Sequence, residues 1–218
     1  MTEPAPLRID VAPSPKAVEA AIAQLPLADR TRTLVVNGGT ADEPSWPTAA
    51  VKTALRAAVR ELATLPGPVI ISGGTQAGLF TLLGEVVAET EFNGPVVGVA
   101  PAGRIDGGNQ TPLEPHHSHA LIVEAESWGD EIPELMALVS LLRQRGPAVA
   151  LIAGGGKQTL AEVEGHLSAG IPVIALRGTG RTTDDLTRTP RRNHGLIIVD
   201  VTDPDGVTAA VCEALKGP

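Results

Sequence analysis

The chain has 218 residues, 43% of them hydrophobic, with 24 Gly, 19 Pro and a formal net charge of −8. This length suits one domain with a full apolar core, predicted to span residues 1–218 with its central part at roughly 33–201. The negative charge and the lack of a long basic run argue against a nucleic-acid partner. A single cysteine, Cys212, excludes a disulfide framework.

The first residues lack the basic region and apolar stretch of a signal peptide, and no apolar segment is long enough to span a membrane. We therefore expect a cytoplasmic protein that does not insert into a membrane.

Apolar runs alternate with segments of helical periodicity along the chain. Strands are predicted over 7–11, 33–36, 69–72, 96–100, 120–124, 149–153, 172–176 and 196–201. Helices are predicted over 14–25, 48–65, 79–87, 131–144, 159–169 and 204–216, with a polar loop over 104–118. Such alternation predicts a three-layer, Rossmann-like α/β fold with a mainly parallel sheet and helices on both faces.

Glycines cluster where the predicted strands end. These are Gly38, Gly39, Gly73, Gly74, Gly103, Gly154, Gly155, Gly156, Gly178 and Gly180. Because parallel strands end at one edge of the sheet, we expect these turns to form one binding rim, together with the neighbouring Thr40, Thr75 and Gly78. Glycine turns followed by helices favour an anionic ligand such as a phosphate.

The glycine cluster at 154–156 is followed by residues that suit phosphate and ribose recognition. Lys157 and Thr159 can bond to phosphate, and Thr159 can instead cap the helix. Glu162 is a candidate for ribose binding, with catalysis as the lesser alternative. Arg181, in a glycine-flanked segment, is the best candidate for a phosphate clamp.

The polar loop contributes Asn109, and the next strand contributes His119, as further ligand-binding candidates. His116, His117 and His119 lack accompanying ligands at metal-binding spacing, so we predict no metal site. Trp46 and Trp128 are candidates for stacking on an adenine and equally for a partner interface.

Several motifs resemble those of a known superfamily. GGTQAGL at 73–79 resembles the first glycine motif of the SLOG superfamily, and GGKQTLAE at 155–162 resembles the PGGxGTxxE motif of its Lonely guy phosphoribohydrolases. LEPHHSHALIV at 113–123, WGDEI at 128–132, and PVIAL with GTGRTTD within 172–184 are similar to the SLOG domain of TRPM channels. The resemblance covers roughly 33–185 and is greatest to the stand-alone prokaryotic, LSDAT-like members.

This resemblance implies a domain that binds ADP-ribose or a related nucleotide, and commonly a homodimer. The enzyme branch also uses an arginine on the helix before the second glycine motif. That position falls near Val139 here, and Arg143 and Arg145 lie about one turn further on. Gly154 and Gln158 replace the Pro and the third Gly of the enzymes' motif.

Three functions therefore stay open. The first is binding or sensing of a nucleotide-derived ligand, ADP-ribose or NAD-like, with no other cofactor implied. The second is a phosphoribohydrolase or N-glycosidase that uses Glu162. The third is a protein-interaction module.

Overall fold

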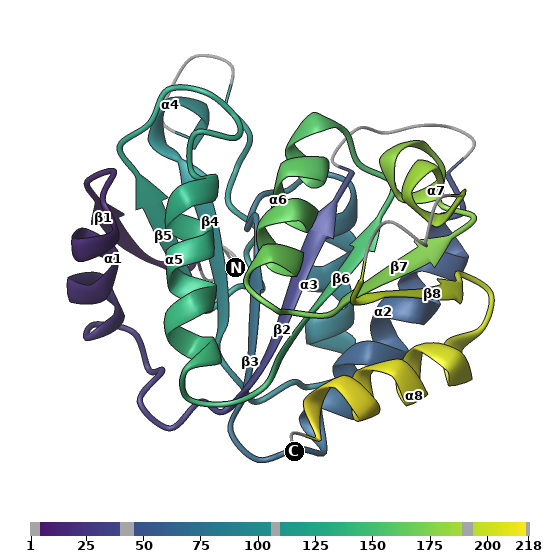
Figure 1. The fold of residues 1–218 in the computed structure, drawn as a ribbon. Helices are drawn as coiled ribbons and strands as arrows, with labels where there is room; N and C mark the ends of the chain where they lie inside the picture. Colours follow the sequence, from purple (N-terminus) through teal and green to yellow (C-terminus); the bar gives the residue numbers. More distant parts are fainter. Residues whose placement is uncertain (1–4, 40–45, 106–109, 189–193, 217–218) are drawn as a thin grey trace.

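The structure is a computed structural model that describes residues 5–39, 46–105, 110–188 and 194–216. Strands and helices alternate along the chain (Figure 1). The strands are β1 (Leu7–Val11), β2 (Arg32–Gly38), β3 (Pro68–Ser72), β4 (Val96–Pro101), β5 (His119–Val123), β6 (Ala148–Ala153), β7 (Val173–Arg177) and β8 (Leu196–Asp200). The helices are α1 (Pro15–Ile22), α2 (Thr48–Ala63), α3 (Leu79–Glu89), α4 (Ala102–Ile105), α5 (Ile132–Arg143), α6 (Lys157–Ser168), α7 (Arg181–Arg188) and α8 (Pro204–Leu215).

All eight strands pair in parallel in the order β1-β5-β4-β3-β2-β6-β7-β8. The order reverses between β2 and β6, which pair from Thr33 with Ala148 to Gly38 with Ala153. From this central pair, β3, β4 and β5 follow outward on one side and β7 and β8 on the other, while β1 forms the outer edge beside β5. In open parallel sheets, such a reversal leaves a crevice at the carboxyl ends of the two strands.

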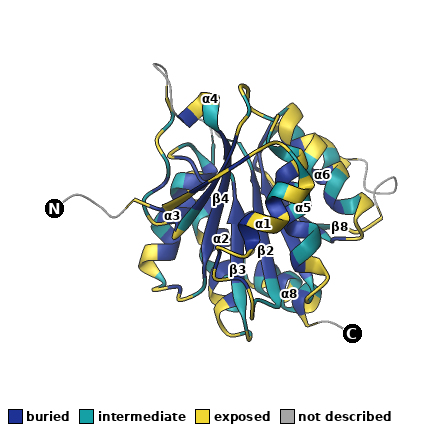
Figure 2. Cartoon of the chain, turned by 90° about the vertical axis from the view of Figure 1, so that its left-hand side faces the viewer, coloured by how far each residue is buried: buried dark blue, intermediate teal, exposed yellow. Residues whose placement is uncertain are grey.

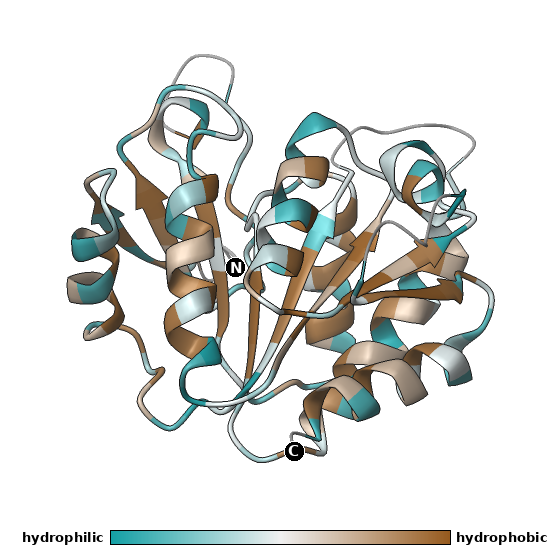
Figure 3. Ribbon diagram, viewed as in Figure 1, coloured by the Kyte–Doolittle hydropathy of each residue, from teal (hydrophilic) through white to brown (hydrophobic). Residues whose placement is uncertain are grey.

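Apolar side chains fill the space on both sides of the sheet. One cluster packs α2, α3 and α8 against the strands, and a second packs α1, α5 and α6 against the other face. Strands β2 to β7 are buried almost throughout, the edge strands β1 and β8 are partly exposed, and the helices expose one side (Figure 2). Hydropathy follows the same division, with apolar strands between amphipathic helices (Figure 3). The predicted three-layer fold is therefore confirmed, with a sheet that is parallel throughout.

Two short helices fall where the sequence predicted loops. One is α4; the other is α7, whose sequence RTTDDLTR offers only Thr183 as a buried residue. Because α7 has no apolar stripe, periodicity could not identify it. No helix among the described residues is long and apolar enough to cross a membrane.

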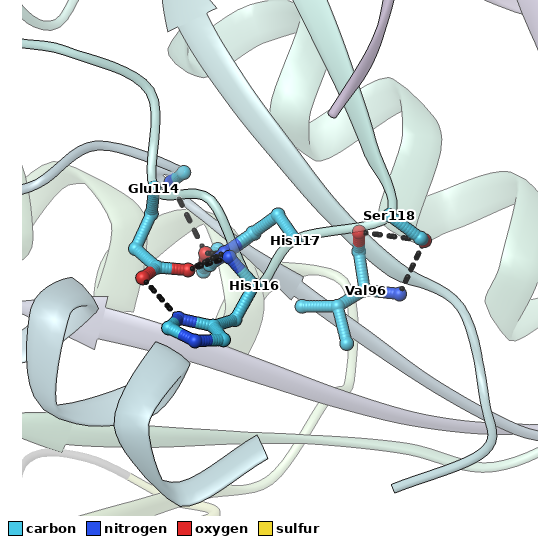
Figure 4. A network of polar contacts seen from close by, with 7 residues as sticks. Val96, Glu114, His116, His117 and Ser118 are labelled. Atoms are coloured by element: carbon cyan, nitrogen blue, oxygen red, sulfur yellow. Dashed lines mark hydrogen bonds and ion pairs between the residues drawn. The ribbon is translucent and has the colours of Figure 1, made fainter. Parts of the chain in front are cut away.

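A buried polar network holds the segment that leads into β5. Glu114 is only 2% exposed, and its carboxylate accepts hydrogen bonds from Nδ1 of His116 at 2.9 Å and Nδ1 of His117 at 3.0 Å (Figure 4). Nε2 of His117 lies 2.7 Å from Oγ of Ser72, at the end of β3. Burial alone would raise the pKa of Glu114, but the bonds from His117 and His116 outweigh it and hold the pKa below its ordinary value.

Gly84, in the middle of α3, leaves the space that the Glu114 carboxyl group occupies. An added Cβ at Gly84 would collide with that carboxyl group. Gly84→Ala should therefore destabilise the protein by about 2–4 kcal/mol through overpacking and a broken buried network, although Gly→Ala normally stabilises a helix by about 1 kcal/mol. Urea unfolding measures the change.

The matched control is the same substitution in a Glu114→Ala background, where the added methyl group has room. There it should cost much less, so that the double-mutant cycle shows strong coupling. Equal costs in the two backgrounds would contradict the steric explanation.

Candidate functional site

A cavity of about 330 Å³ opens at the carboxyl edge of the sheet, at the reversal between β2 and β6. Its volume lies at the lower end of the roughly 300–1,000 Å³ that small-molecule sites occupy. The lining comes from turns and helices that are far apart in sequence: Gly38, Gly39, Gly73, Thr75, Ala77, Phe80, Val99, Thr111, Trp128, Glu131, Leu135, Gly155, Gly156, Gln158, Thr159, Glu162 and Arg181.

One wall is the glycine turn between β6 and α6. Gly154 and Gly155 have φ values of 61° and 90°, a conformation that favours glycine, and Gly156 is the N-cap of α6 without a side-chain cap. The first N–H groups of a helix have no partner within the helix and carry the positive end of its dipole. This wall therefore suits an anionic group.

Helix α7 braces this turn through hydrogen bonds. Thr183 Oγ1 donates to the carbonyl of Gly154 at 2.8 Å, and Thr182 Oγ1 donates to that of Gly156 at 3.1 Å. Thr179 Oγ1 accepts from the N–H of Gly154 at 2.8 Å. Arg181, the first residue of α7, is exposed, lines the cavity, and adopts φ 53°. The same helix thus fixes the turn and brings a guanidinium group to it.

The lining also carries two carboxyl groups. Glu162, on α6, accepts a 2.7 Å hydrogen bond through Oε1 from Nδ2 of Asn37, and Glu131, just before α5, accepts a 2.7 Å bond from the N–H of Gly129. Burial, and next the charge of Glu131, raise the pKa of Glu162 to about 8. Burial also raises the pKa of Glu131. Glu162 therefore tends to hold its proton near neutral pH.

A buried chain of polar groups continues behind Glu162. Oδ1 of Asn37 lies 2.9 Å from Nε2 of His166, and both residues are fully buried. Burial lowers the pKa of His166 to about 4, so its imidazole is neutral at physiological pH. His166 Nδ1 has no hydrogen-bond partner among the described residues.

Aromatic and aliphatic groups complete the lining. Phe80, Val99 and Leu135 lie in the walls, and Trp128 lies at the rim with 38% of its surface exposed. Trp46, the other tryptophan, donates instead to the carbonyl of Thr179 at 3.1 Å and packs on the core. Trp128 is therefore the tryptophan that a bound ring can reach.

Comparison with known proteins fits this architecture. Residues 31–212 match the family described as SLOG in TRPM, prokaryote. The chain belongs to that family. It is also similar to the mouse transient receptor potential cation channel subfamily M member 2, with 25% identity over 176 residues, 62% of this chain and 12% of the channel. The chain therefore corresponds to a small part of the channel.

Solved structures share the fold of this SLOG domain. The molybdenum cofactor carrier protein of Chlamydomonas reinhardtii is 19% identical with a TM-score of 0.56, covering 85% of this chain and 98% of that one. The molybdenum cofactor binding protein of Rippkaea orientalis is 18% identical with a TM-score of 0.58, covering 84% and 97%. At these identities the likeness concerns the fold alone.

Within the SLOG domain, the cavity brings together about half of the site predicted from sequence. The predicted residues that line it are Gly38, Gly39, Gly73, Thr75, Gly155, Gly156, Thr159, Glu162 and Arg181. Those described elsewhere are Gly74, Gly78, Gly103, His119, Gly154, Lys157, Gly178 and Gly180. Thr40 and Asn109 lie outside the described residues. None of these assignments has been tested by a bound ligand, so the site stays a prediction.

Three of the residues outside the lining have structural surroundings that explain their place. Gly74 packs against the backbone of Gly98, and Gly103 packs against Glu126. His119 begins β5, so it lies at the amino edge of the sheet, far from the glycine turns. Thr159 is in the first turn of α6 rather than at its cap, because the helix begins two residues earlier than predicted.

The helix arginine of the Lonely guy enzymes has no counterpart in this cavity. Val139 is buried in the core. Arg143 and Arg145 follow at the carboxyl end of α5, and Arg145 donates to the carbonyl of Leu27. The charged groups of the described lining are Arg181, Glu131 and Glu162. The described residues also contain no group of three or more His, Cys, Asp or Glu arranged to hold a metal ion.

Sequence reasoning missed several residues of the cavity. Glu131 was noticed only as part of a motif, Gln158 only as a replacement in the second glycine motif, and Phe80 was not singled out. Asn37, which lies outside the lining but donates to Glu162, was missed as well. One of these residues, Asn37, could have been found from the sequence. It directly precedes the first glycine pair, at the end of a buried strand. A polar residue at that point of a parallel strand faces the ligand edge of the sheet.

The raised pKa of Glu162 predicts a specific dependence of stability on pH. The folded state keeps a proton that the unfolded state loses above about pH 4.3, so this contribution to stability is full below that pH and is lost as pH rises through about 8. Glu162→Gln cannot titrate. Its free energy of unfolding should therefore fall less than that of the wild type between about pH 5 and about pH 9, by up to a few kcal/mol.

Urea unfolding at a series of pH values measures the difference, and Glu164→Gln, which removes an exposed carboxyl group from the same helix, is the control. Parallel curves for the wild type and Glu162→Gln would contradict the prediction.

Proposed function

We propose that the cavity binds a nucleotide or nucleotide-derived ligand of the ADP-ribose or NAD type. The observation that carries this proposal is that one cavity combines two kinds of group. We expect the glycine turn, the helix N-terminus and Arg181 to form an end for anions, and the two carboxyl groups with their aromatic neighbours to form an end for a sugar and a base. A nucleotide has the same two parts.

At the anionic end, phosphate oxygens would accept hydrogen bonds from the backbone N–H groups of Gly155, Gly156 and the first turn of α6. Positive φ at Gly155 and the absence of a side chain there allow close approach of a ligand to the backbone. Arg181 would neutralise the phosphate, since a guanidinium fork matches two of its oxygens.

At the other end, the ribose and base would lie between Glu162, Glu131 and the aromatic groups. Trp128 is exposed at the rim and can stack on a purine, an interaction worth about 1–3 kcal/mol for each base. The cavity volume corresponds to a mononucleotide-sized part of the ligand. The second half of a dinucleotide would therefore extend out of the cavity, past the rim.

The relatives support binding without turnover. Two proteins that share the fold are named as carrier or binding proteins of molybdenum cofactor. The similar mouse protein is named as a channel subunit, and the match covers 12% of it. We therefore propose a sensor or carrier role, in an assembly that we expect to be a homodimer.

A hydrolase is the second candidate, on one observation. Glu162 retains its proton near neutral pH beside a second carboxyl group, Glu131, which is an arrangement that glycoside hydrolysis can use. The absence of the family's helix arginine from the described lining ranks this candidate below binding.

Isothermal titration calorimetry against ADP-ribose, NAD, AMP and ribose 5-phosphate tests the proposal, with each mixture then analysed by chromatography for freed base. We expect micromolar affinity for ADP-ribose or NAD, weaker binding of ribose 5-phosphate, and intact ligand. Free adenine or nicotinamide accumulating with time would establish the hydrolase instead. No heat with any of the four would contradict the nucleotide proposal.

Arg181→Asn should weaken ADP-ribose binding about 10- to 100-fold, since a hydrogen bond to a charged group is worth about 1.5–3 kcal/mol. Asparagine tolerates the positive φ of this position, so the backbone should persist. Arg188→Asn, at the other end of α7, is the matched control and should bind like the wild type. Equal affinities for all three proteins would remove Arg181 from the site.

Stacking should be visible in tryptophan fluorescence. In a Trp46→Phe variant, Trp128 is the sole tryptophan, and we expect its emission to change on addition of ADP-ribose but not of ribose 5-phosphate, which has no base. A Trp128→Phe variant should give little response. A response carried by Trp46 alone would place the base elsewhere.

A further inference from the structure

We propose that Glu162 acts as a hydrogen-bond donor to the ligand, through a proton on Oε2, and that Asn37 and His166 are the positioning residues that place the proton there. This inference rests on the proposed function only in its choice of ligand. It predicts that Glu162 meets an acceptor atom, such as a ring nitrogen or a ring carbonyl of the base, rather than acting as a carboxylate that binds a ribose diol.

The first step is the tautomer of His166. The ring is fully buried, and its two nitrogens differ, because Nε2 lies 2.9 Å from Oδ1 of Asn37 whereas Nδ1 has no partner among the described residues. A neutral imidazole has one N–H donor and one acceptor nitrogen. Leaving the buried N–H group without a hydrogen-bond partner costs more free energy than leaving the acceptor nitrogen without one. The proton therefore sits on Nε2, which donates to Asn37.

The second step is the orientation of Asn37. Because His166 donates to it, the atom facing His166 must be Oδ1, and the amide nitrogen Nδ2 then faces Glu162. Nδ2 donates to Oε1 of Glu162 at 2.7 Å. Asn37 cannot turn over without opposing two donors at His166, and it is fully buried at the end of β2. Oε1 is thus fixed as an acceptor.

The third step is the place of the remaining proton. Oε1 already accepts a hydrogen bond, so the hydroxyl of a neutral Glu162 carboxyl group is at Oε2. Oε2 makes no hydrogen bond to any described residue, and Glu162 lines the cavity. The result is a hydroxyl group that faces the ligand space.

The charged groups around Glu162 favour its neutral form. Glu131 faces it from the start of α5, and Glu134 lies behind Glu131, buried on the same helix. His166 is neutral. Arg181 lines the same cavity from α7, and Lys157 begins α6 but lies outside the lining. Burial and the like charge of Glu131 both oppose ionisation of Glu162.

Glutamine is the natural mimic of this state, because its amide oxygen can accept from Asn37 while its NH₂ group donates towards the cavity. Glu162→Gln should therefore bind ADP-ribose within a few-fold of the wild type at neutral pH, whereas Glu162→Ala should lose about tenfold or more, as expected for one lost hydrogen bond in a closed site.

The pH dependence separates the donor role from the diol role. Wild-type affinity should fall about tenfold for each pH unit once Glu162 ionises, while the affinity of Glu162→Gln should stay level over the same range. If Glu162→Gln binds as weakly as Glu162→Ala, or if wild-type affinity rises with pH, Glu162 is a carboxylate that accepts from the ligand and the proposal is wrong.

A measurement on the ligand-free protein keeps the inference testable even if no tested nucleotide binds. Glutamate side chains labelled with ¹³C at the carboxyl carbon report ionisation by NMR, and the signal absent from Glu162→Gln belongs to Glu162. We expect this signal to show a protonated carboxyl group at neutral pH. A carboxylate at that pH would overturn the proposal, whereas failure of the titrations alone would count only against the nucleotide ligand.

The same signal tests the positioning residues. Glu131→Gln should lower the titration midpoint of Glu162, because it removes the neighbouring negative charge. Asn37→Leu should raise the titration midpoint of Glu162 above that of the wild type, because the hydrogen bond from Asn37 favours the ionised form. Asn37→Ser replaces it if the leucine variant does not fold. A merely structural Asn37 would change stability and leave the midpoint where it was. Glu164→Gln is the control and should leave the Glu162 signal unmoved.

Discussion

The reversal of strand order between β2 and β6 is the constraint on which the site depends. The helices that follow these two strands leave on opposite faces of the sheet, since α2 packs in one apolar cluster and α6 in the other. The two connections separate at the carboxyl edge and cannot fill the space between them. The cavity lies in that gap. Gly38, at the end of β2, and the turn at Gly155, after the end of β6, both line it.

A crevice of this kind binds a ligand specifically only if its walls are rigid. The glycine turn has no side chains whose contacts could hold its backbone in place. Helix α7 supplies the rigidity from outside, through the hydroxyls of Thr182 and Thr183 on the turn's carbonyls, with Thr179 on its N–H group. These contacts involve the carbonyls of Gly154 and Gly156 and the N–H group of Gly154. They leave the N–H groups of Gly155 and Gly156 for the proposed ligand. The polar sequence of α7 is thus explained by what the helix contacts, because it packs on the backbone of the turn rather than on the apolar core.

This also explains how much could be predicted from the sequence. Runs such as 149–153 are apolar and are followed by glycine, so the strands and their parallel pairing were predictable, and the cavity lies at the edge where the glycine turns were expected to meet. Helix α7 was not, because hydrogen bonds hold it and periodicity reports only apolar contacts. The pairing of Asn37 with Glu162 joins residues 125 positions apart, and no local pattern encodes it. The position of His119 at the start of β5 could not be predicted either, because a motif gives order along the chain but not the strand end at which a residue lies.

Two of the carboxyl groups that are shielded from water, Glu114 and Glu162, have different partners, and these partners give them opposite states. Glu114 receives hydrogen bonds from two imidazoles and stays ionised, fixing the approach to β5. Glu162 receives one amide N–H and faces another carboxyl group, so burial prevails and the proton remains. A satisfied carboxylate has no capacity left for a ligand and serves structure. A carboxyl group held by one oxygen, with the other turned to a cavity, is suited to recognition, and only the second arrangement occurs at the strand reversal.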